Sequence, residues 1–325
     1  MKSSARWLAI ASVLVAAVTA HGQQRPAAVP WVPPDSPHGT GRYKAIMEMD
    51  AMLPTHTVYR PADLAQLGDM KLPIIAWGNG ACVNAGNRFR HFLTEIASNG
   101  YLIVALGPVG PRVLEDGPEI PPAAGGAAPA PARAGGPPPG PPATKIVQLI
   151  EALDWAIGEN GRHGSKYFGK LDTTKVAVMG QSCGGVQAIA ASTDPRVTLT
   201  VAWNSGLVSA STPIMEDVSK DTLAKLHAPI AYFTGGPGDV AYPNADDDFK
   251  RLAAQGRIPV IQAYQDGLPH NGTYREENGG ALGKIAVSYL AWRFKGDETA
   301  GKMFKGPNCG LCTMPGWHVN KSKID

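Results

Sequence analysis

A serine near the middle of the chain lies in a pattern that is typical of an enzyme nucleophile. Residues 180–184 read Gly-Gln-Ser-Cys-Gly, and they lie between the apolar run 176–179 and the helix-forming run 186–191. Between a strand and a helix, the G-x-S-x-G pattern exposes a serine hydroxyl on a sharp turn, where the glycines let helix and strand approach each other. A phosphate-binding loop is the alternative, but the segment lacks the lysine of that motif. The pattern therefore predicts Ser182 as a nucleophile.

A serine hydroxyl needs a base to accept its proton, and in this type of site the base is a histidine later in the chain. Three histidines follow Ser182. His227 precedes an expected strand, at its amino end, and His318 belongs to the C-terminal segment. His270 follows the apolar run 259–264, so it leaves the carboxyl end of an expected strand, where ligands bind in open α/β sheets. We therefore expect His270 to be the base.

The acid that orients the base should leave the carboxyl end of the preceding strand. The apolar run 229–234 continues into the glycine-rich stretch 235–243, and Asp239 is the first carboxylate in it. Its expected role is to fix the tautomer of the imidazole and to stabilise the imidazolium, without taking the proton itself. The three aspartates at 246–248 compete for this role. They begin an expected helix, so we predict that they form its acidic, solvated first turn.

Acyl transfer also needs hydrogen-bond donors that face the oxyanion. One donor in such sites is the backbone N–H of the residue after the nucleophile, here Cys183. The second donor is expected in the loop 78–82, which follows the apolar run 72–77. A plain tight turn is the alternative for this loop. The candidates for the second donor are the backbone N–H groups of Asn79, Gly80 and Ala81.

The four cysteines fall into two pairs. Cys82 and Cys183 each flank a predicted oxyanion donor, and their loops should face each other across the site. We therefore predict a Cys82–Cys183 disulfide that fixes the donors, and a Cys309–Cys312 disulfide that closes a small loop. The second pair forms a CxxC motif, but the chain has no second CxxC to complete a zinc site and no thioredoxin-like context. An even number of cysteines favours disulfides in an exported protein.

The first twenty residues have the features of a signal peptide. Lys2 and Arg6 give a positive start, the apolar stretch 7–18 follows, and small residues precede a predicted cleavage near Ala20. A buried N-terminal helix is the alternative. The apolar stretch is too short to span a bilayer, and no later segment approaches the ~20 apolar residues that a transmembrane helix needs. The sequence therefore predicts a secreted or periplasmic protein that does not stay attached to a membrane.

The elements that must position these residues alternate along the chain. A strand pair at 43–49 and 56–60 comes first. Further strands are expected at 72–77, 101–106, 175–179, 198–203, 229–234 and 259–264, and helices at 89–97, 145–157 and 281–294. Strands that alternate with helices form a mostly parallel sheet with helices on both faces. The fold class is therefore α/β.

The flanking segments complete the predicted organisation. Residues 21–42 are rich in proline and glycine and are expected to form an extended arm before one domain over 43–295. Within it, residues 117–143 are an alanine-, glycine- and proline-rich surface insert, for which a lid over the site is the alternative. Residues 296–325 are expected to be a C-terminal tail that carries the CxxC motif.

Charge and composition exclude other classes of protein. Of 325 residues, 30 are lysine or arginine and 27 are aspartate or glutamate, and both signs are scattered along the chain. Nucleic-acid binding needs a basic patch or stripe, which this distribution does not provide. The apolar share of 44% fits a globular enzyme with a core.

Three stretches resemble motifs of secreted esterases of the dienelactone-hydrolase and cutinase-like (polyester-hydrolase) type. They are residues 180–185, 236–243 and 266–270. In those enzymes a Gly-x-x-Asp-x-x-x-Pro run carries the acid and an Asp-Gly-x-x-His run carries the base. The resemblance covers about residues 45–295, and it implies an α/β-hydrolase fold with the triad Ser182, Asp239 and His270.

The resemblance implies hydrolysis of carboxylic esters, but it does not imply a polyester substrate. Polyester hydrolases usually carry histidine and methionine around the serine, where this chain has Gln181 and Cys183. The expected protein is a serine esterase that forms an acyl-enzyme on a small-molecule or polymeric ester, without a metal or an organic cofactor. A peptidase or amidase of the same fold and a non-catalytic binding protein are the alternatives.

Overall fold

The computed structural model describes residues 36–110, 143–208 and 218–324. The predicted signal peptide, most of the predicted arm and nearly all of the predicted insert lie outside these ranges. Among the described residues, no helix combines the length and the apolar character that crossing a bilayer requires.

Nine strands form one sheet in the order β1-β2-β4-β3-β5-β6-β7-β8-β9. Their bounds are β1 Ala45–Asp50, β2 Leu53–Pro61, β3 Leu72–Gly78, β4 Leu102–Leu106, β5 Leu171–Gln181, β6 Leu199–Trp203, β7 Ile230–Gly235, β8 Val260–Gln265 and β9 Trp317–Ser322. Strands β3 to β8 are mutually parallel, whereas β1, β2 and β9 join antiparallel at the two edges. The fold class is therefore α/β with a mostly parallel sheet, as predicted.

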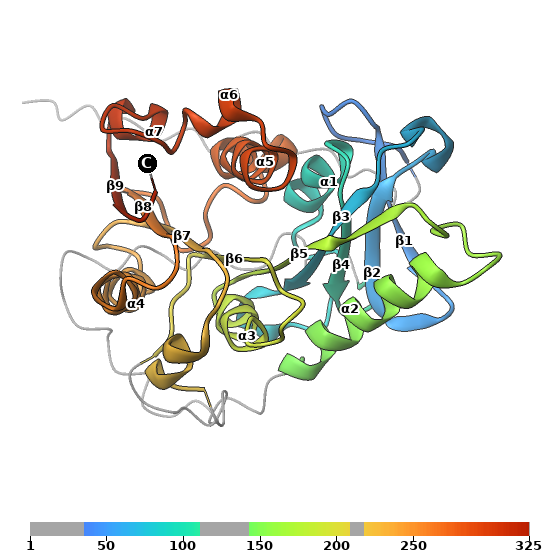
Figure 1. The fold of residues 1–325 in the computed structure, drawn as a ribbon, viewed down its shortest axis with the longest axis horizontal. Coiled ribbons are helices and arrows are strands. Elements are labelled where there is room, and N and C mark those ends of the chain that lie inside the picture. Colours follow the sequence, from blue (N-terminus) through green and yellow to red (C-terminus); the bar gives the residue numbers. More distant parts are fainter. Residues whose placement is uncertain (1–35, 111–142, 209–217, 325) are drawn as a thin grey trace, which may run out of the picture.

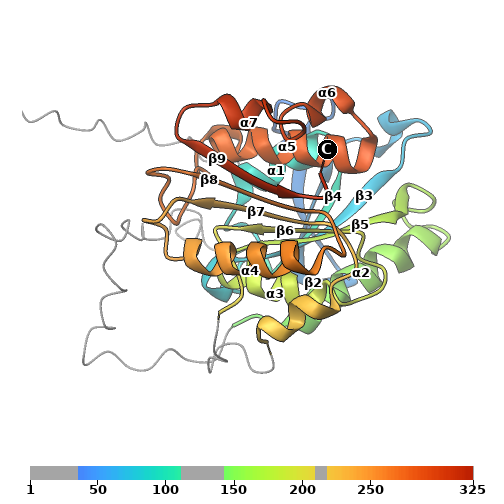
Figure 2. The same cartoon turned by 60° about the vertical axis from the view of Figure 1, so that its left-hand side comes forward.

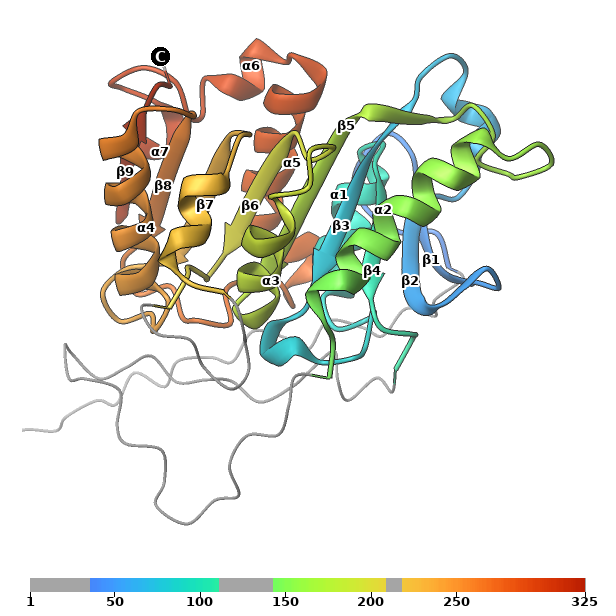
Figure 3. The same cartoon turned by 60° about the horizontal axis from the view of Figure 1, so that its bottom comes forward.

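Helices cover both faces of this sheet (Figures 1 and 2). Helices α1, α5, α6 and α7 lie on one face, and α2, α3 and α4 lie on the other, which is turned forward in Figure 3. Their bounds are α1 Arg90–Ser98, α2 Ile146–Gly161, α3 Cys183–Ala191, α4 Tyr242–Gln255, α5 Gly280–Lys295, α6 Glu298–Gly301 and α7 Gly310–Thr313. Short 3-10 helices span Leu64–Leu67, Gly80–Cys82, Lys220–Lys225 and Glu277–Gly279.

Strands β3 and β4 are apolar and buried along their whole length, as expected for parallel strands that are covered on both faces. In β3, Ile75 and Trp77 pack into the core under α1 and α5. Ile74 and Ala76 point the other way, into the core under α2. All four side chains are fully buried. Packing on both faces therefore holds the strands, and with them the ends of the loops that connect them, in fixed positions.

Residues 296–324 of the segment predicted as a C-terminal tail (296–325) contribute to the sheet and to its core. Strand β9 pairs antiparallel with β8, with Gln265 opposite Trp317. Phe304 and Leu311 are fully buried in the same core as α5. The domain therefore does not end at 295, because the tail covers the edge that β8 would otherwise expose.

The register of the parallel strands brings the predicted site loops to one edge. Gly78 at the end of β3 lies opposite Gly180 of β5, and the last residue of β5 lies opposite Trp203 at the end of β6. Farther along, Gly235 of β7 lies opposite Gln265 of β8. The chain therefore leaves five neighbouring strands at nearly the same level, which is the edge where ligands bind in open α/β sheets.

Candidate active site

Ser182 occupies a sharp turn between β5 and α3. Its backbone angles, φ 53° and ψ −121°, are a combination that residues other than glycine rarely adopt. The turn is tight because its glycines touch backbone. A Cβ on Gly180 would lie 2.2 Å from the carbonyl oxygen of Gly184, and one on Gly184 would lie 2.0 Å from the carbonyl carbon of Gly78. The turn therefore has the strained strand-to-helix geometry that the G-x-S-x-G pattern predicts.

The three residues predicted as a triad lie in hydrogen-bonding contact. His270 Nε2 lies 2.9 Å from Ser182 Oγ, and His270 Nδ1 lies 2.6 Å from Asp239 Oδ1. They come from the loops after β5, β7 and β8, and the histidine and aspartate are only 4% and 1% exposed. The other two downstream histidines lie elsewhere. His227 contacts the carbonyl oxygen of Val197, and His318 pairs with Asp266.

The carboxylate of Asp239 accepts four hydrogen bonds. Oδ1 accepts from His270 and from the backbone N–H of Ala241 at 2.9 Å, and Oδ2 accepts from the N–H of Gly235 at 2.9 Å and from Asn204 Nδ2 at 2.7 Å. Burial acts to raise the pKa of Asp239, but the hydrogen bond and charge of His270, with the donors of Ala241 and Asn204, outweigh it. The pKa therefore lies below the ordinary value of 3.8. The carboxylate is ionised at neutral pH and holds the imidazole Nδ1–H.

Two polar residues that the sequence did not point to also support the triad. Gln181 is buried and donates from Nε2 to the carbonyl oxygen of His270 at 3.0 Å. Its Oε1 lies against Gly80, where a Cβ would come within 2.0 Å of it. Asn204 follows β6 and contacts Asp239. Their positions, just before the nucleophile and just after an apolar strand on the same edge, are the signals that could have identified them.

The loop that carries the predicted second oxyanion donor is held by the side chain of Asn79. Its Nδ2 lies 3.0, 3.0 and 2.7 Å from the carbonyl oxygens of Val83, Ala85 and Leu106, and its Oδ1 accepts from Trp77 Nε1 at 3.1 Å. The side chain of Asn79 thus fixes the loop from within.

Next in this loop, Ala81 and Cys82 have positive φ angles of 54° and 49°. Such a backbone is unfavourable for L residues and persists only where its surroundings hold it in place. Asn79, Gly80 and Ala81 stay the predicted donors on this loop.

Both predicted disulfides are present. Cys82 and Cys183, 101 residues apart, are joined with a Cα–Cα distance of 5.3 Å. This bond ties the loop after β3 to the residue that follows the nucleophile. Cys309, the residue just before α7, is joined to Cys312 within that helix. Together they account for all four cysteines of the chain.

The prediction that the aspartates at 246–248 form the acidic, solvated first turn of a helix is wrong in position for all three, because α4 begins at Tyr242 and has no acidic residue in its first turn. It is also wrong about the burial of one of them. Asp246 and Asp247 are partly exposed and pair with residues one turn later, as expected for a solvated turn. Asp248 is fully buried, because it shares the inward stripe of α4 with Ala245 and Leu252. It accepts from the N–H of Leu207 at 2.7 Å and pairs with Lys220 at 2.6 Å. Burial raises the pKa of Asp248 to about 6.

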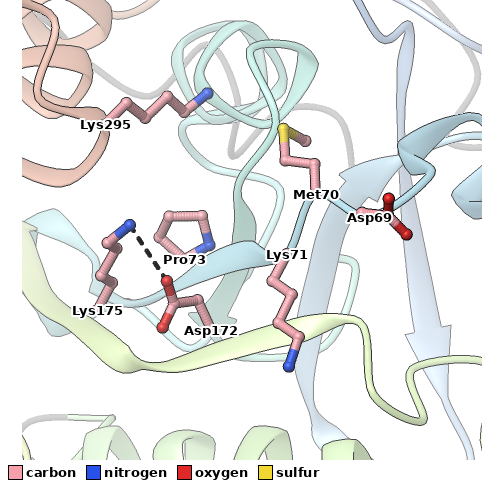
Figure 4. Close-up of a pocket in the computed structure, with 7 residues that line it drawn as sticks. All are labelled: Asp69, Met70, Lys71, Pro73, Asp172, Lys175 and Lys295. Atoms are coloured by element: carbon pink, nitrogen blue, oxygen red, sulfur yellow. Dashed lines mark ion pairs between the residues drawn. The ribbon is translucent and has the colours of Figure 1, made fainter.

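Two hollows in the described part of the chain bear on the choice of site, and they lie in different places. The larger of the two lies at the amino ends of β3 and β5, whereas the triad follows the carboxyl ends of the strands. Its lining residues are shown in Figure 4. It is lined by Asp69, Met70, Lys71, Pro73, Asp172, Lys175 and Lys295, and Lys175 pairs with Asp172 at 3.2 Å. The smaller one adjoins the triad and is lined by Arg88, Phe89, Gln181, Asn271 and Arg275. None of the predicted site residues lines the larger hollow.

Nothing in the described ranges brings three or more histidine, cysteine, aspartate or glutamate side chains together as a metal site. In comparisons with known proteins, no family model and no curated protein matches the chain. The case for a function therefore depends on the geometry of the site.

Proposed function

We propose that the chain is a serine hydrolase of the α/β-hydrolase fold that cleaves carboxylic esters. One observation carries the proposal: the imidazole of His270 lies between the hydroxyl of Ser182 and the carboxylate of Asp239, at 2.9 and 2.6 Å. These are the contacts that a base needs in order to deprotonate a serine and to be oriented by an acid.

The arrangement along the chain supports the fold assignment. The nucleophile lies on a strand-to-helix turn after β5, and the triad follows in the order Ser182, Asp239, His270. The loop after β3 is joined to the residue after the nucleophile by a disulfide. In α/β-hydrolases the triad has the same order, and a loop after β3 supplies the second oxyanion donor.

The proposed reaction has two halves. In the first, Ser182 Oγ attacks the ester carbonyl and His270 Nε2 takes its proton. The tetrahedral intermediate then collapses, the C–O bond to the alcohol breaks, and the protonated imidazole returns its proton to the departing alkoxide. In the second half, a water molecule attacks the acyl-enzyme with His270 again as base, and the acid is released as Ser182 regains its proton.

The negative charge on the intermediate needs donors that are fixed before the reaction. We assign this role to the backbone N–H of Cys183 and to one N–H among Asn79, Gly80 and Ala81. Loss of one such donor costs on the order of 100-fold in kcat or more in a well-studied protease. The disulfide and the buried side chain of Asn79 both restrain this loop, which supports the assignment.

We further propose that the protein works outside the cytoplasm after removal of residues 1–20. The two disulfides are compatible with an oxidising compartment, secreted or periplasmic. The proposed partner is an ester substrate, small or polymeric, rather than a nucleic acid or a membrane.

The decisive test uses purified protein with esters of p-nitrophenol and a fluorophosphonate probe. Wild type should release a burst of p-nitrophenol and become labelled at Ser182. The variant Ser182→Ala should lose labelling, and its kcat should fall on the order of 10⁶-fold if the triad acts as one unit. Faster turnover of a matched anilide than of the ester would indicate an amidase. Absence of labelling in wild type would support a binding protein instead.

A further inference from the structure

A line of hydrogen bonds continues from the triad into the core. Beyond Asp239, the carboxylate oxygen that does not face the imidazole accepts from Asn204 Nδ2 at 2.7 Å. Asn204 Oδ1 in turn accepts from the hydroxyl of Tyr274. Asn204 and Tyr274 are 0% and 1% exposed, so water does not compete for these contacts. The two residues are partners of the acid, and they do not touch the reacting atoms.

The backbone places Asn204 for this contact. It follows Trp203, the last residue of β6, and its φ of 40° lies in the left-handed region, which asparagine tolerates better than most residues. Its backbone N–H donates to the carbonyl oxygen of Phe233 at 2.7 Å, so the residue is fastened to the strand that leads to the acid. Its side-chain amide therefore points into the gap between the acid loop and the base loop.

Tyr274 reaches the same amide from the loop that carries the base. It lies four residues after His270, and its ring packs edge-on against Phe89 and Phe92 at 5.3 and 5.1 Å between centroids. A buried hydroxyl needs an acceptor, and Asn204 Oδ1 supplies one. Because the hydroxyl donates to Oδ1, it fixes which end of the amide faces Asp239.

We propose that Asn204 and Tyr274 are positioning residues, which hold Asp239 so that only its Oδ1 faces the imidazole. This inference depends on the proposed serine-hydrolase function. With Oδ2 occupied by Asn204 and by the N–H of Gly235, a rotation of the carboxylate would break two buried hydrogen bonds. The contact between Oδ1 and the imidazole is therefore made before substrate binds.

The first test replaces Tyr274 by phenylalanine, which keeps the ring and removes only the hydroxyl. We expect kcat for a p-nitrophenyl ester to fall about fivefold, the effect of one neutral hydrogen bond, with KM unchanged. The matched control is Tyr101→Phe. Tyr101 is also fully buried in the same core, and its hydroxyl has no hydrogen-bond partner among the described residues. This control should retain the kcat of wild type.

The second test adds Asn204→Ala and the double variant. Asn204→Ala should lower kcat at least tenfold, again without a change in KM. If the hydroxyl acts only through this amide, Tyr274→Phe should cost nothing further in the Asn204→Ala background. If the two losses of kcat instead multiply in the double variant, Tyr274 does not act through Asn204, and the proposed path of hydrogen bonds from Tyr274 to Asp239 is wrong.

A third measurement does not depend on turnover. The proton between His270 Nδ1 and Asp239 should give a far-downfield NMR resonance, which should shift or broaden in Tyr274→Phe and stay in place in Tyr101→Phe. An unchanged resonance, together with a kcat within twofold of wild type, would overturn the proposal. If wild type neither turns over esters nor labels, the proposed function fails. The resonance then still decides whether these residues hold Asp239.

Discussion

The disulfide between Cys82 and Cys183 should matter for both stability and turnover, and the second disulfide provides a matched control. In each pair one cysteine is buried and the other is partly buried. The perturbations are the double variants Cys82→Ala/Cys183→Ala and Cys309→Ala/Cys312→Ala. Any difference between them should therefore reflect where the crosslink lies and how much chain it closes.

The expected loss of stability follows from the length of the closed loop. A disulfide restricts the unfolded chain, and its contribution grows with the logarithm of the number of residues that it encloses. The Cys82–Cys183 bond spans 101 residues. Its removal should lower the free energy of unfolding by about 4.7 kcal/mol on this entropic account. The other bond spans 3 residues, for which the same relation gives about 1.6 kcal/mol.

The two double variants should also differ in kcat. Only Cys82–Cys183 ties the predicted oxyanion loop to the residue after the nucleophile. At a temperature where both variants are folded, its removal should lower kcat about 10- to 100-fold, since a loosened donor approaches the loss of that donor. The control variant should keep the kcat of wild type.

The assays are urea denaturation without reductant and initial rates on a p-nitrophenyl ester. Equal losses of stability in the two double variants would refute the loop-length reasoning. A wild-type kcat in Cys82→Ala/Cys183→Ala would show that this disulfide stabilises the fold without positioning the oxyanion donors.

Three further predictions concern single side chains. Because the pKa of Asp239 lies below its ordinary 3.8, its ionised form stabilises the fold above that value, and this contribution is lost as pH falls below about 4. The stability difference between wild type and Asp239→Asn, measured by denaturation at several pH values, should therefore shrink in acid. Gly184→Ala would place a Cβ 2.0 Å from backbone, so it should destabilise by about 3 kcal/mol or more and abolish turnover. Lys220→Met should lower the free energy of unfolding by about 3 kcal/mol at pH 8, because it leaves Asp248 charged and buried without its cation. The loss should be smaller below pH 6, where Asp248 is protonated. An equal loss at both pH values would contradict this account.

The parallel part of the sheet was predictable because its strands are buried on both faces. Such strands are short unbroken apolar runs, and the run at 72–77 corresponds to β3 at Leu72–Gly78. The same signal identified β6, β7 and β8 within one or two residues. The Cys82–Cys183 pairing was predictable because each of these two cysteines lies beside a predicted donor, and the CxxC motif left Cys309 and Cys312 as the second pair. Both pairs are confirmed.

What was not predicted depends on contacts that a local pattern does not contain. Strand β9 is an edge strand whose apolar residues, Trp317 and Val319, are too few to give a clear period. Asp248 was assigned to a solvated turn, but the rotation of α4 turns it inward to meet Lys220, 28 residues away. Asn204 meets Asp239 across 35 residues; its place after an apolar run puts it at the right edge of the sheet but does not show which residue it contacts.

The position of these polar side chains is nevertheless fixed by the apolar core. Trp203 is fully buried, stacked on Phe233 at 4.8 Å between centroids and edge-on to Phe92 at 5.1 Å. A slip of β6 by one residue would turn every side chain of the strand to the opposite face, so it would remove the indole from this cluster and replace it with Ala202 or Asn204. The cost of losing a buried tryptophan is about 3–5 kcal/mol. The core thus holds the end of β6 in the register from which the amide of Asn204 reaches the acid.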